Sequence, residues 1–310
     1  MEREDDAMPG ARLHDQSTIA VEVHGRGPTV LLAVNPTPVE GPQAEELRRW
    51  GVDPALGRTL IDGLGDRFRV VAFDYEGHVL QNPKPDTLTP ANLAADLLAV
   101  ADAAGADRFA YYGYSWLALA GLQLAVRTDR LTGLVMGGFP PLDGPYAQML
   151  QVTTATHAMA VANSASAPSG ATTSPSSEDA SGEPDWSQVE VSLTEAQTRQ
   201  FVTLYQALQG FDDRAAQAQL GCPRLCFAGS ADEIDYGERW GGVRVSMAGP
   251  VISRQAELEA LGWQVQVLEG LDHTQAMQAA QVLPILRPWL ITWLAAPRTV
   301  AGPGSAPGAS

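Results

Sequence analysis

Positive charge is scarce in this chain of 310 residues. Lysine and arginine together number 20 against 36 aspartate and glutamate residues, which gives a formal net charge of −16 at pH 7. A nucleic-acid partner bound without regard to sequence requires a basic face that displaces counterions, so the charge argues against this class of partner and we expect none. The same negative field repels anionic substrates at long range and favours neutral ones.

Long apolar runs and cysteines are scarce as well. No run approaches the roughly 18 apolar residues that a membrane span requires. Residues 1–16 are polar and acidic, unlike a secretory or transit signal, so we expect a cytoplasmic protein. Cys222 and Cys226 are too close along the chain for an ordinary disulfide, and we expect both to be small core residues.

Strand-like and helix-like segments alternate through most of the chain. Two strand-like runs, at residues 19–24 and 29–34, flank the turn 25–28 and indicate an opening hairpin. Further along, strand-like runs alternate with helical patterns, as is typical of βαβ units. We therefore predict an α/β fold with a mostly parallel central sheet and helices on both of its faces.

The alternation breaks in the middle of the chain. Residues 146–162 and 193–220 are helix-compatible, while residues 163–184 between them are rich in Ser, Ala and Thr and bury too little apolar surface to order themselves. We predict two cap helices joined by this flexible segment. The expected organisation is a disordered tail at 1–16, core segments at 17–142 and 221–296, a helical cap at 143–220 and a second disordered tail at 297–310.

The most informative motif is Gly113-Tyr114-Ser115-Trp116-Leu117, which stands between a strand-like run and an Ala/Leu-rich helical run. A serine in such a sharp strand-to-helix turn is exposed, and the first N–H groups of the helix face any oxyanion that forms beside it. Leu117 departs from the usual G-x-S-x-G pattern. We predict Ser115 as a nucleophile and the Trp116 N–H as an oxyanion donor.

A nucleophilic serine also needs a base and a carboxylate. The hydroxyl gives its proton to an imidazole, and the carboxylate orients that imidazole and offsets its transient charge. Asp232 and His273 each follow a strand-like run, which places them at carboxyl ends of strands, where α/β sheets carry their chemistry. Glu233 and Asp235 remain rivals of Asp232 for the role of the acid.

These residues occur in the order Ser, Asp, His, and the chain resembles the α/β-hydrolase superfamily over roughly residues 18–296. The motifs that carry this resemblance, besides the serine turn, are Asp74-Tyr75-Glu76-Gly77-His78, Gly229-Ser230-Ala231-Asp232 and Gly270-Leu271-Asp272-His273. They are similar to the family's loop after its fourth strand, its acid-bearing turn and its histidine turn. The resemblance implies a triad of Ser115, Asp232 and His273 that works without a metal or an organic cofactor.

The loop that follows residues 29–34 is expected to supply the second oxyanion donor. Asn35-Pro36-Thr37-Pro38 stands where the family commonly has His-Gly-x-Pro, and Thr37 matches the donor position. Pro36 has no N–H and cannot adopt a positive φ, so the backbone of this loop differs from the common form. Asn35 is either a side-chain donor or a brace of the loop.

Aromatic residues near Ser115 and in the cap favour a neutral, hydrophobic substrate group. Candidate contacts are Asn35, Tyr114, Tyr146 and Trp186. The resemblance implies a serine hydrolase that cleaves a small-molecule carboxylic ester or lactone through an acyl-enzyme. An acyltransferase or thioesterase with the same triad and a non-catalytic ligand-binding protein of this fold stay open. So does the oligomeric state, a homodimer included.

Overall fold

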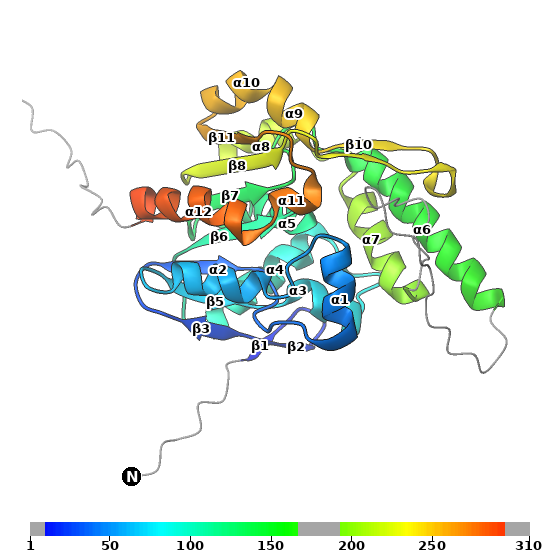
Figure 1. The fold of residues 1–310 in the computed structure, drawn as a ribbon, viewed down its shortest axis with the longest axis horizontal. Coiled ribbons are helices and arrows are strands. Elements are labelled where there is room, and N and C mark those ends of the chain that lie inside the picture. Colours follow the sequence, from blue (N-terminus) through cyan, green and yellow to red (C-terminus); the bar gives the residue numbers. More distant parts are fainter. Residues whose placement is uncertain (1–9, 167–192, 295–310) are drawn as a thin grey trace, which may run out of the picture.

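The computed structural model describes residues 10–166 and 193–294. A central sheet lies between two layers of helices, with a helical cap beside it (Figure 1). The strands are β1 (Gly10–Arg12), β2 (Thr18–Ala20), β3 (Glu22–His24), β4 (Thr29–Leu32), β5 (Arg69–Ala72), β6 (Phe109–Tyr114), β7 (Leu131–Gly137), β8 (Arg224–Gly229), β9 (Glu233–Asp235), β10 (Arg244–Ser246) and β11 (Trp263–Leu268). The helices are α1 (Gly41–Arg49), α2 (Leu56–Leu64), α3 (Tyr75–Gln81), α4 (Pro90–Ala103), α5 (Trp116–Ala125), α6 (Tyr146–Ser166), α7 (Glu195–Ala207), α8 (Asp213–Ala216), α9 (Ala248–Ser253), α10 (Gln255–Ala260), α11 (His273–Ala276) and α12 (Ala279–Leu294), with short 3-10 helices η2 (Gln217–Gln219) and η3 (Glu238–Trp240).

The central sheet has seven strands in the order β11-β8-β7-β6-β4-β5-β3. All neighbouring strands are parallel except β3 and β5. The chain leaves β4 for β5 on one side and returns to β6 on the other, so the strand order reverses between β4 and β6. Open α/β sheets bind ligands outside the carboxyl ends of their strands at such a reversal.

Alternate side chains of the strands supply two separate cores. Leu31 of β4 packs in one core with Leu119 of α5, while its neighbour Val30 packs in the other core with Leu286 of α12. This alternation follows from the two-residue period of a strand and requires helices on both faces of the sheet. The fold class predicted from the sequence is therefore confirmed.

The predicted opening hairpin is wrong. Strand β3 pairs antiparallel with β5, and β4 runs parallel to the other edge of β5, so β5 separates the two segments. The connecting turn packs against the segment between α2 and β5: a Cβ at Gly25, where φ is 70°, would lie 2.1 Å from the backbone oxygen of Gly65. The glycines of this turn serve that close approach and not a tight hairpin.

The N-terminal tail is shorter than the sequence predicted. Residues 10–12 form β1, which pairs antiparallel with β2. Ala11 and Leu13 are buried at 1% and 2% exposure in the same core as helix α4. Two apolar side chains among polar neighbours give a weak strand signal, which explains why the sequence did not predict β1. The rest of the predicted tail, residues 1–9, lies outside the described residues, as does the whole of the second predicted tail at 297–310.

The cap consists of α6 and α7, which lie side by side (Figure 1). Helix α6 runs to Ser166, past the predicted end at residue 162, so the first residues of the predicted flexible segment 163–184 are helical. The remainder of that segment lies outside the described residues. Helix α7 begins with a capping box in which Thr194 and Gln197 satisfy each other's backbone N–H groups.

A second element contacts the cap. The β9–β10 hairpin, which follows the turn of Asp232, reaches α6 at its tip, where the Gln151 side chain donates a hydrogen bond of 3.1 Å to the Gly241 oxygen. This hairpin is not among the predicted elements, because its two strands have only three residues each and carry little periodic signal.

Residues 77–78, expected in a loop, belong to helix α3. Asp74 caps the helix by accepting a hydrogen bond of 2.8 Å from Gly77 N, and a Cβ at Gly77 would lie 2.2 Å from an Asp74 carboxylate oxygen. The Asp-x-x-Gly pattern therefore serves to start a helix.

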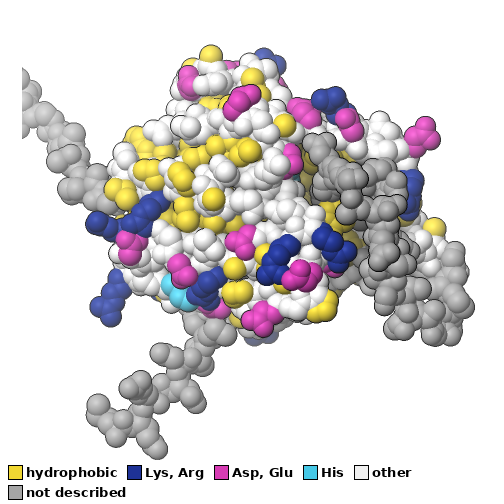
Figure 2. Space-filling model, in the orientation of Figure 1, with side chains coloured by type: hydrophobic (Ala, Val, Ile, Leu, Met, Phe, Trp, Pro, Cys, Tyr) yellow, Lys and Arg dark blue, Asp and Glu magenta, His cyan; other side chains and the backbone are white. Residues whose placement is uncertain are grey.

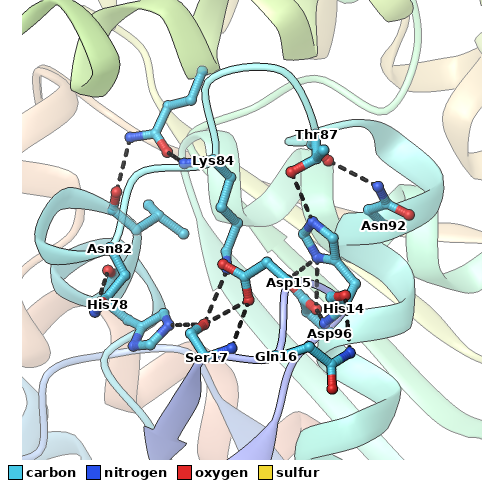
Figure 3. A network of polar contacts seen from close by, with 12 residues as sticks. His14, Asp15, Gln16, Ser17, His78, Asn82, Lys84, Thr87, Asn92 and Asp96 are labelled. Atoms are coloured by element: carbon cyan, nitrogen blue, oxygen red, sulfur yellow. Dashed lines mark hydrogen bonds and ion pairs between the residues drawn. The ribbon is translucent and has the colours of Figure 1, made fainter.

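Helix α7 is fixed to α3 and to the segment that follows it. The fully buried Gln200 accepts a hydrogen bond from Lys84 N at 3.1 Å and donates one to the Val79 oxygen at 3.0 Å. Below this contact, the Lys84 ammonium binds Asp15 and Ser17 in the turn between β1 and β2, and Ser17 Oγ lies 2.9 Å from His78 Nε2 (Figure 3). The cap therefore rests on a polar network that joins three distant parts of the chain.

Within the described ranges, no helix combines the length and the apolar character needed to cross a bilayer. Figure 2 shows hydrophobic side chains gathered over α12 and its surroundings, where Ile291 and Trp293 are among the exposed apolar residues. Cys222 and Cys226 are buried, as the sequence predicted.

Candidate active site

Ser115 occupies the sharp turn between β6 and α5. Its backbone has φ 56° and ψ −132°, a left-handed conformation that is uncommon for residues other than glycine. Ser115 N donates a hydrogen bond of 2.8 Å to the Gly137 oxygen on the neighbouring strand, and Ser115 O accepts one of 2.9 Å from Ala118 N. These two bonds hold the strained turn and lift the side chain above the sheet edge.

The turn closes in spite of Leu117. A Cβ at Gly113 would lie 2.3 Å from the backbone oxygen of Leu117, so the first glycine of the motif is required for the close approach of strand and helix. The Leu117 side chain points into the core and is 6% exposed, and its backbone oxygen accepts a hydrogen bond of 2.9 Å from the Tyr111 hydroxyl. The second glycine of the usual pattern is thus dispensable here.

Asp232 lies in the turn after β8 and is fully buried. Its Oδ2 lies 2.8 Å from His273 Nδ1, and because a carboxylate only accepts hydrogen bonds, Nδ1 carries the proton. Its Oδ1 has no partner among the described residues. The rivals from the sequence are engaged elsewhere: Glu233 binds Arg244 and Ser246, and Asp235 lies 3.9 Å from Arg244.

His273 is the first residue of α11. Asp272 caps this short helix together with Gln275, which fixes the backbone of the histidine turn. That turn is tied to the acid turn, because Ala231 N donates a hydrogen bond of 3.0 Å to the Leu271 oxygen. The imidazole is 23% exposed, with Nδ1 held by Asp232 and Nε2 left for a substrate or for Ser115.

Tyr114 connects the serine turn with the histidine turn. Its hydroxyl donates a hydrogen bond of 2.7 Å to the His273 backbone oxygen, and the two rings lie 5.1 Å apart. Ser115, Asp232 and His273 are thereby brought to one end of the sheet. No hydrogen bond joins Ser115 Oγ to His273 among the described residues, and such bonds often tighten only when substrate binds.

Of the two predicted oxyanion donors, one N–H is unbonded within its helix and the other already donates a hydrogen bond. The Trp116 N–H belongs to the first turn of α5 and has no acceptor within its helix. The Thr37 N–H donates a hydrogen bond of 3.0 Å to Asn35 Oδ1. Asn35 is thus a brace of its loop, one of the two roles that the sequence left open, and it occupies the amide that was expected to bind the oxyanion.

The predicted substrate contacts are dispersed. Tyr114 is 9% exposed and lies against His273. Tyr146 stands at the start of α6, where its hydroxyl donates to Asp213 at 3.2 Å and its ring contacts Phe211. Trp186 lies outside the described residues.

One contact near Ser115 has no counterpart in the sequence patterns. Trp116 Nε1 donates a hydrogen bond of 3.2 Å to Glu76 Oε1, which brings the start of α3 to the start of α5. The ring of Trp116 also contacts Tyr75 and, from the cap, Phe201. In the sequence Glu76 appears only as part of the motif at residues 74–78, because nothing local in the sequence links it to Trp116.

No group of three or more His, Cys, Asp and Glu side chains able to hold a metal ion occurs in the described part of the chain. Two open surface hollows, of about 620 Å³ and 690 Å³, lie elsewhere, one near Arg127 and Cys222 and one along α1. Neither includes Ser115, Asp232 or His273, so the site is located by its chemistry and not by the size of a hollow.

Comparisons with solved structures identify this arrangement. An esterase from Thermogutta terrifontis superposes with a TM-score of 0.55 at 16% identity, over 92% of this chain and 98% of the other. An esterase from Exiguobacterium antarcticum gives 0.56 at 14% identity, over 93% and 100%. This chain has the α/β-hydrolase fold.

An enol-lactonase from Burkholderia xenovorans LB400 is also similar, with a TM-score of 0.53 at 15% identity over 92% of this chain and 100% of the other. No family model and no curated protein sequence matches the chain. The evidence for the α/β-hydrolase fold is therefore the similarity of the three-dimensional structures. It agrees with the fold that the sequence motifs implied.

Proposed function

We propose that the protein is a serine hydrolase that cleaves a hydrophobic carboxylic ester or lactone through an acyl-enzyme. The observation that carries the proposal is the pairing of His273 Nδ1 with the buried Asp232 at 2.8 Å, at the same end of the sheet as the strained Ser115. The solved esterases and the enol-lactonase that share the fold support this reaction class.

In the proposed reaction, Ser115 Oγ attacks the carbonyl carbon while His273 Nε2 takes the hydroxyl proton. Asp232 stays ionised, holds the imidazole with Nε2 toward Ser115, and offsets the imidazolium charge. The tetrahedral intermediate collapses when His273 returns the proton to the departing alkoxide. Water, activated by His273, then attacks the acyl-enzyme and releases the acid and free Ser115.

The oxyanion of each tetrahedral intermediate needs N–H donors in place. The Trp116 N–H is available, whereas the Thr37 N–H must exchange Asn35 Oδ1 for the oxyanion. We propose that substrate binding drives this exchange, since a full negative charge is a stronger acceptor than an amide oxygen. No metal or organic cofactor takes part in these steps.

The first test is labelling with a fluorophosphonate probe, located by peptide mass spectrometry. We expect one labelled serine, Ser115, and no labelling in Ser115→Ala or His273→Ala. Ester turnover in both variants should fall by at least about a thousandfold, because members of a triad act as a unit. Ser253→Ala, on the exposed surface of α9, is the matched control and should label like the wild type.

Full turnover by Ser115→Ala would overturn the mechanism. A folded wild type that binds esters without turnover or labelling would favour the ligand-binding protein. Transfer of the acyl group to an added alcohol or amine in preference to water would favour the acyltransferase.

A further inference from the structure

Glu76 is a carboxylate without a cationic partner beside the serine turn. Its Oε1 accepts a hydrogen bond of 3.2 Å from Trp116 Nε1, and Trp116 directly follows Ser115. No lysine or arginine of residues 10–166 and 193–294 forms an ion pair with it. The residue is exposed at its surface and could meet a bound molecule.

The surroundings of Glu76 leave its negative charge poorly compensated. Burial among neighbouring atoms and the nearby Asp74 both raise the pKa of its carboxyl, while the Trp116 hydrogen bond and the charge of His273 oppose this rise. Glu76 nevertheless keeps exposed surface, so its charge is open to a bound molecule. Glu76 and His273 interact electrostatically, so the carboxylate lies within electrostatic range of the proposed reacting atoms.

Aromatic rings stand beside this charge. The Trp116 ring contacts Tyr75 at 6.1 Å and Phe201 of α7 at 5.4 Å between centroids. An organic ammonium group is attracted both by a carboxylate and by the faces of aromatic rings, most strongly by tryptophan. An anionic group in the same place would meet an unpaired negative charge.

We propose that Glu76 and Trp116 form a subsite for an organic ammonium group, so that the preferred ester carries a quaternary or protonated amine on the part of the molecule that lies beside Ser115. This inference rests on the proposed function and replaces the neutral substrate expected from the sequence with a cationic one. The ester bond itself stays the reacting group, and Glu76 acts through binding and not through proton transfer.

A bracing role is the alternative, in which Glu76 only holds the indole of Trp116 and hence the oxyanion N–H. Glu76→Gln separates the two roles, because glutamine keeps an oxygen that accepts the Trp116 hydrogen bond but carries no charge. Glu45→Gln, on the exposed face of α1, removes a charge away from the site and is the matched control.

The test compares a thiocholine ester of butyric acid with its neutral 3,3-dimethylbutyl thioester, which has the same shape without the charge. We expect the wild type to favour the cationic ester in kcat/KM by about tenfold, as a carboxylate and an aromatic face together would give. Glu76→Gln should lose this preference, measured as the ratio of the two kcat/KM values, while Glu45→Gln should behave as the wild type.

The pH dependence of this preference gives a second readout. Asp74, His273 and Trp116 lie near Glu76. His273 is the proposed base for both esters, so its effect cancels in the ratio of the two rates. The preference should be full at neutral pH and fall as the pH drops through the raised pKa of Glu76, above the range of an ordinary glutamate.

Equal kcat/KM for the two esters in the wild type would overturn the subsite. A Glu76→Gln variant that keeps the wild-type preference would also overturn it, because glutamine retains the hydrogen bond to Trp116 and bracing alone would then account for Glu76. If the proposed function itself were wrong, the result would be different. Neither ester would turn over, and the fluorophosphonate probe would not label Ser115.

Discussion

Ser115 holds a backbone conformation that its neighbours impose on it. The bond from Ser115 N to the Gly137 oxygen, the bond from Ala118 N and the missing side chain at Gly113 together fix a positive φ that costs on the order of 1–3 kcal/mol. Such strain persists only where the surroundings outweigh it, and it places the hydroxyl at the end of the sheet.

Gly113→Ala tests this constraint. The new Cβ would lie 2.3 Å from the Leu117 oxygen, so strand β6 and helix α5 must separate. We expect the free energy of unfolding to fall by about 1–3 kcal/mol and ester turnover to fall by roughly a hundredfold, since a displacement of about 1 Å misaligns the nucleophile. Denaturant titration and kcat/KM measure the two effects.

Gly221→Ala is the control for this substitution. A Cβ at Gly221 meets no atom within 4 Å, and its φ is not positive, so stability should stay the same or rise slightly. Unchanged turnover in Gly113→Ala would show that the turn tolerates a wider approach than the structure indicates.

The residues of the candidate site differ in whether the sequence predicts their positions and contacts. Ser115, Asp232 and His273 are predictable because each follows a strand, and that order is a property of the linear sequence. The contact of Trp116 with Glu76 joins segments 40 residues apart, and the bond from Thr37 to Asn35 depends on the direction of one side chain. Neither leaves a pattern in the sequence.

At the scale of elements, the turn between β1 and β2 supports the cap through Lys84. The ammonium of Lys84 has no exposed surface and binds the carboxylate of Asp15, while Lys84 N binds Gln200 of α7. Burial alone would raise the pKa of the Asp15 carboxyl, but the hydrogen bonds from Lys84 and Ser17 outweigh it and lower the pKa to about 2.

Asp15→Asn therefore should weaken the protein in a pH-dependent way. A carboxyl whose pKa is lowered on folding stabilises the native state above its unfolded pKa, near 3.9, and loses this contribution as the pH falls toward 2. After allowance for its partial exposure, we expect a loss of about 1–2 kcal/mol at pH 7 and a smaller loss at pH 3. Urea unfolding at both pH values measures it.

The double variant Lys84→Met/Asp15→Asn should recover part of the loss, because it removes the buried charge that Asp15→Asn leaves unpaired. A loss in Asp15→Asn that is the same at pH 3 and pH 7 would show that the ion pair is not its source.

The elements of the core were largely predictable, and their pairing was not. Local periodicity in the sequence predicts buried strands such as residues 109–114 and helices such as residues 90–103. The partner of β3 lies beyond two helices in the chain, and the cap helices depend on contacts with Lys84 and Val79 that local sequence does not encode.

At the scale of the whole molecule, the net charge of −16 surrounds the site with a negative potential. This field acts on a substrate before contact and is independent of any one carboxylate. Salt screens it over about 10 Å at 0.1 M ionic strength. The charge of the molecule and the charge of Glu76 can therefore be measured separately.

We expect kcat/KM for the thiocholine ester to fall severalfold between about 0.01 and 0.5 M ionic strength, with little change for the neutral thioester. Glu76→Gln should lower the rate on the cationic ester at every salt concentration and keep most of the salt dependence. Stopped-flow or steady-state kinetics across the salt series measure this, and a flat profile for the cationic ester would refute a role of the global charge.

Lys84 is the only lysine of the chain, and the fold encloses it completely. Apart from the terminal amine, the native protein therefore presents no amino group to an acylating reagent and no site to a protease that cuts after lysine. Either reagent acts only on molecules in which the contact between the β1–β2 turn and the cap has opened. The rate at which Lys84 is acylated therefore measures how often this contact opens in the native protein.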